Sequence, residues 1–390
     1  MRGKLGDTVT GDGGSKDDKK SFEHELNEKR KRFGAQHKAK ITRKLGLVMA
    51  FSGHKCLSLQ MGSSSDFFEI FATEPGATDG VSFARFMELA MYHPTAGYYT
   101  RDFKRVGRDE KADFFTSTTF SPVFGELVAA AAVKLLSPAN PADFMFVEVG
   151  AEPGAGILRD VSHPFAGYQP ISLGQPFVIP PKSVLFSNEL FDAQPFHRIV
   201  WRNGRWRELG VALNGRHLRE VELPELTGEV ATNVDRLPKA AAENYHIDLP
   251  LRTIPMLERL VGAGQNWKGL FIAFDYGKFW EELAEHVPAG TGRTYHRQKM
   301  GGDLLARPGK QDLTCHICWD WLEDGLVRAG FGEPRVDSQE KFFMHHAADA
   351  LAAITKAEAS SFSPRKRMLI QLLHPANMGQ KFQALHALRR

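Results

Sequence analysis

The sequence predicts an α/β fold: an open sheet with an N-terminal helical cap and an inserted antiparallel β meander. Strand-like apolar runs alternate with helical patterns, which is typical of an open sheet covered by helices. A glycine-rich turn directly follows the first of these runs. Two Asn-Gly pairs, at 203–204 and 214–215, are strong hairpin signals and predict the meander. Ligands of open α/β sheets bind outside the carboxyl ends of the strands, so the functional site is expected there.

The first two helices are predicted from the spacing of apolar residues. From Phe83 to Met91 these residues recur at three- and four-residue steps, which gives one apolar face. This helix is expected to end near His93-Pro94, because the residue before a proline disfavours helix. Ser121-Pro122 opens a second helix that runs to about Leu136, since proline suits a first helical turn.

The segment 144–158, FMFVEVGAEPGAGIL, combines a buried strand with a glycine turn. The strand stops at Gly150, and a short helix is expected over 155–161, just after Gly154. Such a junction presents bare backbone N–H groups to a ligand, and Glu148 stands two positions before the first glycine. This spacing suits a ligand that carries an amino acid group and an adenosine, such as S-adenosylmethionine.

Other ligands of glycine turns fit this segment less well. A dinucleotide site needs G-x-G-x-x-G and an acid about 20 residues on, and residues 168–176 contain no Asp or Glu. A phosphate-binding loop needs Gly-Lys-Ser/Thr, which does not occur in this turn. A plain strand-to-helix turn, in which glycine only satisfies the backbone, stays open as an alternative.

The remaining elements follow in chain order. Apolar runs predict strands over 168–173, 183–187 and 268–275, and a helix is expected over 253–261. The meander is placed at 198–223. Two final strands, 368–373 and 381–385, are expected around a turn at 377–379.

The charge of the chain is unevenly distributed. Residues 1–60 carry 14 Lys/Arg and 7 Asp/Glu, while the rest of the chain carries 36 basic and 39 acidic residues. We therefore expect a disordered basic extension over 1–75 and one folded domain over 76–390. Because the folded part is mildly acidic, a nucleic-acid partner is not expected. No apolar run approaches the length of a membrane span, so no membrane partner is expected either.

The three cysteines argue for a reducing compartment. We expect a cytoplasmic location, with the mitochondrial matrix as the alternative for a eukaryotic chain, because seven acids in 1–60 are untypical of a presequence. Met61 is an alternative start. Cys315 and Cys318 flank His316, but a structural zinc needs four ligands and no partner pair lies nearby. We therefore expect no metal, and both thiols to be buried.

Four separated stretches resemble one family, the MidA-like class I methyltransferases, which has bacterial members and a mitochondrial complex I assembly factor that methylates a protein arginine. They are Phe86–Tyr99, Asp113–Glu126, Val147–Gly154 and Ser187–Arg198, with weaker matches at Phe274–Gly277, Arg307–His316 and Met378–Phe382. The resemblance implies a Rossmann-like class I methyltransferase fold, the cofactor S-adenosylmethionine, and methyl transfer to a protein side chain, arginine by family.

The resemblance also assigns roles to individual residues. Glu148, Gly150 and Gly154 match the cofactor loop, and Asn188 belongs to a signature after the fourth family strand. A segment that closes over the cofactor in such proteins is matched by Asp113, Phe114, Thr116 and Ser117. Two features depart from the family: Glu152 replaces a middle glycine, and the stretch before Asn188 is short and lacks a helix and the acid that would hold the ribose. A non-catalytic assembly or binding protein is therefore the alternative function, and a nicotinamide enzyme is disfavoured by the glycine spacing.

Glu189 and Asp192 are the catalytic candidates. They lie three residues apart after a strand, and two facing carboxylates can grip a guanidinium in bidentate fashion. The alternative is that Asn188 caps a helix whose positive end merely favours Glu189. Tyr295 and His296 are weaker candidates for lining the acceptor cleft.

Overall fold

The computed structural model describes residues 66–100, 122–264, 267–297, 299–359 and 363–390. Most of the predicted extension, and the matched segment with Asp113, Phe114, Thr116 and Ser117, lie outside the described residues. The helix α2 (Phe67–Ala72) lies within the predicted extension over 1–75, and it buries Phe67 and Phe71. Asp66 caps this helix by accepting a hydrogen bond from the Phe68 N–H at 3.1 Å.

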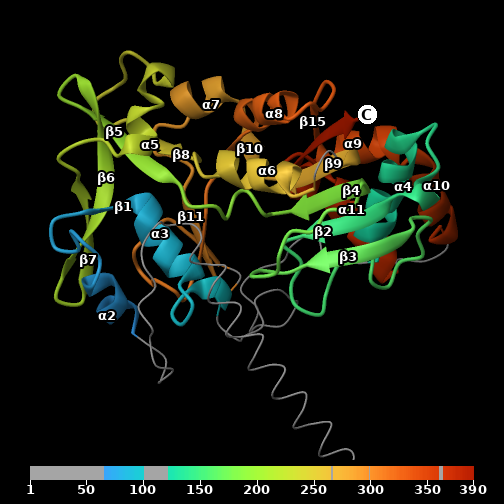
Figure 1. Ribbon diagram of the computed structural model, residues 1–390, viewed down its shortest axis with the longest axis horizontal. Coiled ribbons are helices and arrows are strands. Elements are labelled where there is room, and N and C mark those ends of the chain that lie inside the picture. The colour runs from blue at the N-terminus through green and yellow to red at the C-terminus, as the bar shows by residue number, and fades with distance from the viewer. Residues whose placement is uncertain (1–65, 101–121, 265–266, 298, 360–362) are drawn as a thin grey trace, which may run out of the picture. The chain divides into compact units, whose positions relative to one another are not determined.

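A six-stranded sheet forms the centre of the fold, in the order β15-β16-β9-β4-β2-β3 (Figure 1). Its parallel strands are β2 (Met145–Val149), β3 (Gly167–Ile171), β4 (Lys182–Asn188) and β9 (Lys268–Asp275). The strand β16 (Gln383–Arg389) runs antiparallel between β9 and β15 (Arg335–Ser338). This arrangement confirms the predicted α/β sheet.

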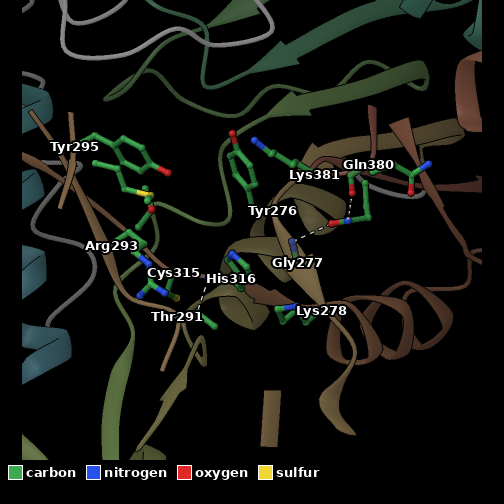
Figure 2. Close-up of a pocket in the computed structure, with 13 residues that line it drawn as sticks. Tyr276, Gly277, Lys278, Thr291, Arg293, Tyr295, Cys315, His316, Gln380 and Lys381 are labelled. Carbon is green, nitrogen blue, oxygen red and sulfur yellow. Dashed lines mark hydrogen bonds between the residues drawn. The ribbon is translucent and has the colours of Figure 1, made fainter. Parts of the chain in front are cut away.

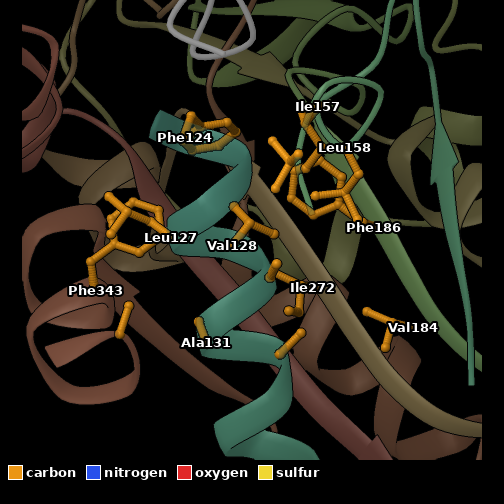
Figure 3. Packing of buried hydrophobic residues seen from close by; sticks show 14 of the residues in the cluster. Phe124, Leu127, Val128, Ala131, Ile157, Leu158, Val184, Phe186, Ile272 and Phe343 are labelled. Carbon is orange, nitrogen blue, oxygen red and sulfur yellow. The ribbon is translucent and has the colours of Figure 1, made fainter. Parts of the chain in front are cut away.

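Helices cover both faces of this sheet. On one face, α4 (Val123–Leu136), α9 (Gln339–His346), α10 (Ala348–Ala357) and α11 (Pro364–Leu373) share one apolar cluster. Figure 3 shows Phe124, Val128 and Ala131 along α4, next to sheet residues such as Phe186 and Ile272. On the other face, α6 (Thr253–Gly262) and α8 (Trp319–Arg328) pack in a second cluster.

The region between β2 and β4 carries no helix in the structure. The predicted helix at 155–161 is wrong, because Gly156 has φ +149° and the residues after it form turns. Ile157, Leu158 and Val161 nevertheless bury their side chains in the cluster around α4. An irregular loop thus covers part of the sheet.

The C-terminal prediction is half right. Residues 381–385 overlap the strand β16, but 368–373 belong to the helix α11. Leu369 and Leu372 are buried three residues apart, which is a helical spacing, and Ser363 caps the helix through the Lys366 N–H at 3.1 Å.

A second sheet contains the predicted meander, formed by β5 (His197–Arg202), β6 (Arg205–Asn214) and β7 (His217–Glu222). Two strands that the sequence did not predict complete it, β1 (Val81–Ser82) and β8 (His246–Leu249). Both Asn-Gly pairs form hairpin turns, with Asn203 at φ +51° and Gly204 at φ +72°. The cap helix α3 (Phe83–Tyr92) packs on this sheet, where the Phe83 and Phe196 rings lie 4.9 Å apart.

Five short strands lie in the chain between β9 and β15 of the main sheet. They are β10 (Gly277–Lys278), β11 (Arg293–His296), β12 (Lys299–Gly301), β13 (Asp312–Thr314) and β14 (Ile317–Cys318); the short helices α5 (Gly228–Ala231) and α7 (Trp280–Glu285) complete the regular elements. Cys315 and Cys318 are buried free thiols, as expected. Within the described residues, every helix is too short or too polar to cross a membrane.

Candidate functional site

Three central strands end at the same edge of the main sheet. Val149 of β2 pairs with Ser187 of β4, and Asn188 pairs with Phe274 of β9. The loops that follow these strands therefore meet at the carboxyl edge, which is the usual ligand site of an open α/β sheet.

The glycine turn after β2 leaves its backbone open. Gly150 and Gly154 have φ +89° and +76°, a left-handed conformation that favours glycine. A side chain added at Gly154 would meet no atom within 4 Å, so a ligand has room to approach the backbone. The half-buried Glu152 lies between the two glycines.

Glu148 lies beneath this turn. Its Oε2 accepts hydrogen bonds from the Ile157 N–H at 2.8 Å and from the Tyr168 hydroxyl. Only 3% of the residue is exposed, and burial raises the pKa of Glu148. These contacts hold the turn in place, and the contact of Glu148 with a cofactor stays a prediction.

The segment after β4 forms turns and bends from Glu189 to Gln194. The alternative in which Asn188 caps a helix is therefore wrong. The Asn188 amide instead donates to Glu189 Oε1 at 2.9 Å, and Glu189 adopts a left-handed backbone with φ +50°. A non-glycine residue in this region costs about 1–3 kcal/mol, and such residues cluster at functional sites.

Asp275, at the end of β9, holds this segment. Its Oδ2 accepts from the Phe191 N–H at 2.9 Å and the Asp192 N–H at 3.4 Å, while Oδ1 accepts from the Tyr276 N–H at 2.9 Å. Asp275 is fully buried, so each bond satisfies a donor that would otherwise cost about 1–3 kcal/mol. Asp275 lies in the Phe274–Gly277 family match, but no local pattern in the sequence indicates this structural role.

Four acids gather here, and we call Glu189, Asp192, Asp275 and Asp312 the acidic cluster. Asp192 is 4% exposed, and its Oδ1 has no hydrogen-bond partner among the described residues. Burial, and then the charges of Asp275, Glu189 and Asp312, raise the pKa of Asp192 well above its usual range. Because like charges disfavour joint ionisation, this cluster favours a bound proton or a positively charged ligand.

A cavity of about 300 Å³ lies near the acidic cluster, and Figure 2 shows the residues that line it. Burial and then the charge of Glu189 raise the pKa of Tyr276, and burial and then Asp192 raise that of Tyr295, so both rings lie near the cluster. The Cys315 N–H donates to the Asp192 carbonyl at 3.1 Å, which ties the cavity wall to the cluster. Among the described residues, the charged side chains of the lining are the basic Lys278, Arg293 and Lys381, and no acidic side chain belongs to it. Its other polar residues are Tyr276, Thr291, Tyr295, Thr314, His316, Gln380 and Gln383.

The structure brings the loop that carries Gly150 and Gly154 close to the segment 188–192, but neither Glu189 nor Asp192 lines the cavity. A Cβ atom added at Gly150 would lie 3.2 Å from Leu190 Cδ1, so the loops that follow β2 and β4 are adjacent. Tyr295 lines the cavity and His296 is absent from its lining. Distant segments supply Lys278, His316 and Lys381. His316 and Lys381 lie in the weaker family matches, but only the tertiary fold places them at this cavity.

Comparison with known proteins agrees with this geometry. Residues 173–331 match the model of a family described as candidate S-adenosyl-L-methionine-dependent methyltransferases. The mitochondrial protein arginine methyltransferase NDUFAF7 homolog of Drosophila melanogaster is 26% identical over 326 residues, covering 69% of this chain and 69% of the relative. Human NDUFAF7, also named a mitochondrial protein arginine methyltransferase, is 24% identical over 374 residues, covering 78% and 79%.

The fold is shared with a crystal structure from Burkholderia thailandensis that was solved with S-adenosyl-homocysteine bound. It superposes with a TM-score of 0.70 at 21% identity, covering 90% of this chain and 94% of that one. A second crystal structure from this organism gives a TM-score of 0.68 at the same identity. These matches confirm the predicted class I methyltransferase fold.

Proposed function

We propose that this chain, a member of the MidA-like family of S-adenosylmethionine-dependent methyltransferases, methylates an arginine side chain of a protein. The observation that carries the substrate is the acidic cluster, in which Asp192, Asp275 and Asp312 are buried and which lies near two tyrosines that line an open cavity. The names of the curated relatives support the same substrate class. Their mitochondrial location favours the mitochondrial alternative for this chain.

The cofactor, when bound, supplies a methyl group activated on a sulfonium. Gly150, Gly154 and Asn188 are the described residues that would hold it. The open space at Gly154 suits close approach of a ligand, and the buried Asn188 Oδ1 has no hydrogen-bond partner among the described residues. The protein's task is then to orient the acceptor and to exclude water.

The acidic cluster suits a guanidinium acceptor. A guanidinium is a planar cation with five donors in a fixed fork, which matches carboxylates in bidentate geometry. Glu189 and Asp192 would orient this fork and draw its positive charge toward the bonded nitrogens, leaving another nitrogen more nucleophilic. Tyr276 and Tyr295 offer ring faces that favour a cation.

Asp192 is also placed to accept the proton that an arginine loses when it is methylated. Its unpartnered Oδ1 is buried beside Asp275, and both carboxyl groups have raised pKa values because of burial. A general base works best when its pKa lies near the operating pH. Asp275 Oδ2 accepts a hydrogen bond from the Asp192 N–H at 3.4 Å, which fixes the position of Asp192.

The test uses the purified full chain with cofactor labelled in the methyl group and a mitochondrial protein extract as acceptor. We expect saturable cofactor binding by calorimetry and label recovered as methylarginine after hydrolysis. Asp192→Asn should bind cofactor normally and lose at least about 100-fold in transfer rate, the scale of one general base. Asp303→Asn, at an exposed turn, is the matched control and should retain activity.

Label recovered on lysine or on a carboxylate would refute the arginine assignment. The absence of saturable cofactor binding would instead support the alternative in which the fold persists in a non-catalytic assembly protein.

A further inference from the structure

We propose that Asp337, His346 and His386 bind a divalent transition metal of the zinc class, which fastens α9 to the strands β15 and β16. One donor atom from each residue lies within 4.8 Å of the other two. No other group of this kind occurs among the residues that the structure describes. None of the three residues has a part in the proposed methyl transfer.

The fold places these side chains together for a simple reason. Arg335 of β15 pairs with His386 of β16 in the antiparallel ladder, so Asp337, two residues further on, lies on the same face as His386. The helix α9 packs on that face, since the Phe342 and His386 rings lie 5.3 Å apart. His346 ends this helix, and its ring lies 5.1 Å from that of His386.

His386 supplies the observation that points to a ligand. The residue is 6% exposed, and its Nε2 has no hydrogen-bond partner among the described residues. This nitrogen lies 3.6 Å from Asp337 Oδ2, too far for a hydrogen bond. A buried polar atom without a partner costs free energy, and a metal ion between the nitrogen and the carboxylate would satisfy both atoms.

Small side-chain movements would complete the site. Donors around a tetrahedral ion with bonds of about 2.0–2.1 Å lie roughly 3.3 Å apart, so the 4.8 Å spread must contract. His346 is half-buried at a helix end and can rotate toward the strands. Lys341 Nζ forms an ion pair with the other carboxylate oxygen, Asp337 Oδ1, at 2.6 Å. The Lys341 side chain is 58% exposed, so it can keep this ion pair or move into solvent when a metal binds.

The donor set selects the class of metal. Two imidazoles and one carboxylate suit Zn²⁺, Co²⁺ or Ni²⁺, whereas Ca²⁺ and Mg²⁺ prefer oxygen ligands. Three protein ligands leave a fourth position for water. Because the ion would join the end of a helix to two strands, its effect would be on the stability of this part of the sheet.

The experiment measures metal content and stability of the full chain after chelation and after addition of Zn²⁺. We expect one equivalent of bound zinc, a raised melting temperature, and a visible absorption band when Co²⁺ replaces it. His386→Ala and His346→Ala should each weaken zinc binding at least tenfold. His217→Ala, which removes an exposed histidine of β7, is the matched control and should bind as the wild type does.

Two results would overturn the proposal, and a third would contradict the class of metal assigned. One is a wild-type chain that binds no zinc and shows no shift in melting temperature with it. The other is unchanged zinc affinity in His346→Ala, the variant that changes a half-buried residue and is therefore informative even when His386→Ala fails to fold. Equal stabilisation by Mg²⁺ would also contradict the assigned donor chemistry.

Discussion

Gly156→Ala tests whether the contact between Glu148 and Tyr168 holds the glycine turn after β2 in place. Gly156 has φ +149°, and a Cβ at this position would lie 1.9 Å from the Tyr168 hydroxyl and 3.1 Å from Glu148 Oε2. The substitution must therefore separate Tyr168 from Glu148, in addition to straining the backbone. Gly154→Ala is the matched control, because its φ of +76° imposes strain while its Cβ meets no atom within 4 Å.

The two substitutions should lower the free energy of unfolding by measurably different amounts. Backbone strain alone costs about 1–2 kcal/mol for an L-residue in a left-handed conformation, which is the whole cost for Gly154→Ala. Loss of the hydrogen bond between Tyr168 and the buried Glu148 adds about 1.5–3 kcal/mol if that carboxylate is charged. We expect Gly156→Ala to be less stable than Gly154→Ala by about 2 kcal/mol, and to bind cofactor more weakly.

Urea denaturation measures the stabilities and calorimetry the cofactor affinities. Tyr168→Phe removes the hydroxyl that the new Cβ would meet, so in the double variant the two substitutions should cost less than their sum. Equal stability of Gly156→Ala and Gly154→Ala would refute the reasoning, because it would mean that the Glu148–Tyr168 contact does not hold the turn.

Three further predictions concern charge. Glu152→Gly removes a half-buried carboxylate from the cofactor turn and should tighten S-adenosylmethionine binding about tenfold, or ~1.4 kcal/mol, by calorimetry; an unchanged affinity contradicts this. Burial raises the pKa of Asp192, so the transfer rate should increase with pH along a limb above the ordinary carboxyl range, and a limb that persists in Asp192→Asn would exclude this assignment. Burial lowers the pKa of His197, but hydrogen bonds with Glu208 and Glu229, each at 2.8 Å, raise it overall. Ionised His197 therefore stabilises the fold fully at pH values below its pKa in the unfolded chain, and this stabilisation is lost as the pH rises through its pKa in the folded protein. His197→Gln should therefore destabilise the fold more at pH 5.5 than at pH 9, as measured by urea titrations.

Local signals explain which elements could be predicted. The buried runs at 183–187 and 268–275 formed strands, and both Asn-Gly pairs formed hairpins, because these patterns act over a few residues. The strand predicted over residues 368–373 was wrong, because a short apolar run fits a strand and a buried helix equally well. The helix predicted over 155–161 was wrong, because Gly156 adopts a positive φ that is incompatible with a helix.

The candidate site could be predicted only in part. Glu189 and Asp192 follow one strand, so a local motif found them. Asp275 and Asp312 join them from segments that are 83 and 120 positions beyond Asp192 in the chain, and only the sheet topology and the small sheet of β13 bring them close. Tyr276 lies in the Phe274–Gly277 family match, but its place in the cavity wall depends on the same topology.

The strand β16 has a consequence for how the chain is made. It is hydrogen-bonded between β9 and β15, and both of these leave the ribosome before it does. Until β16 enters, β9 and β15 each present a row of unpaired backbone groups, which is a template for pairing with other chains. The six-stranded sheet can therefore be completed only after β16 has left the ribosome, and until then a holding chaperone would protect the chain by covering those two edges.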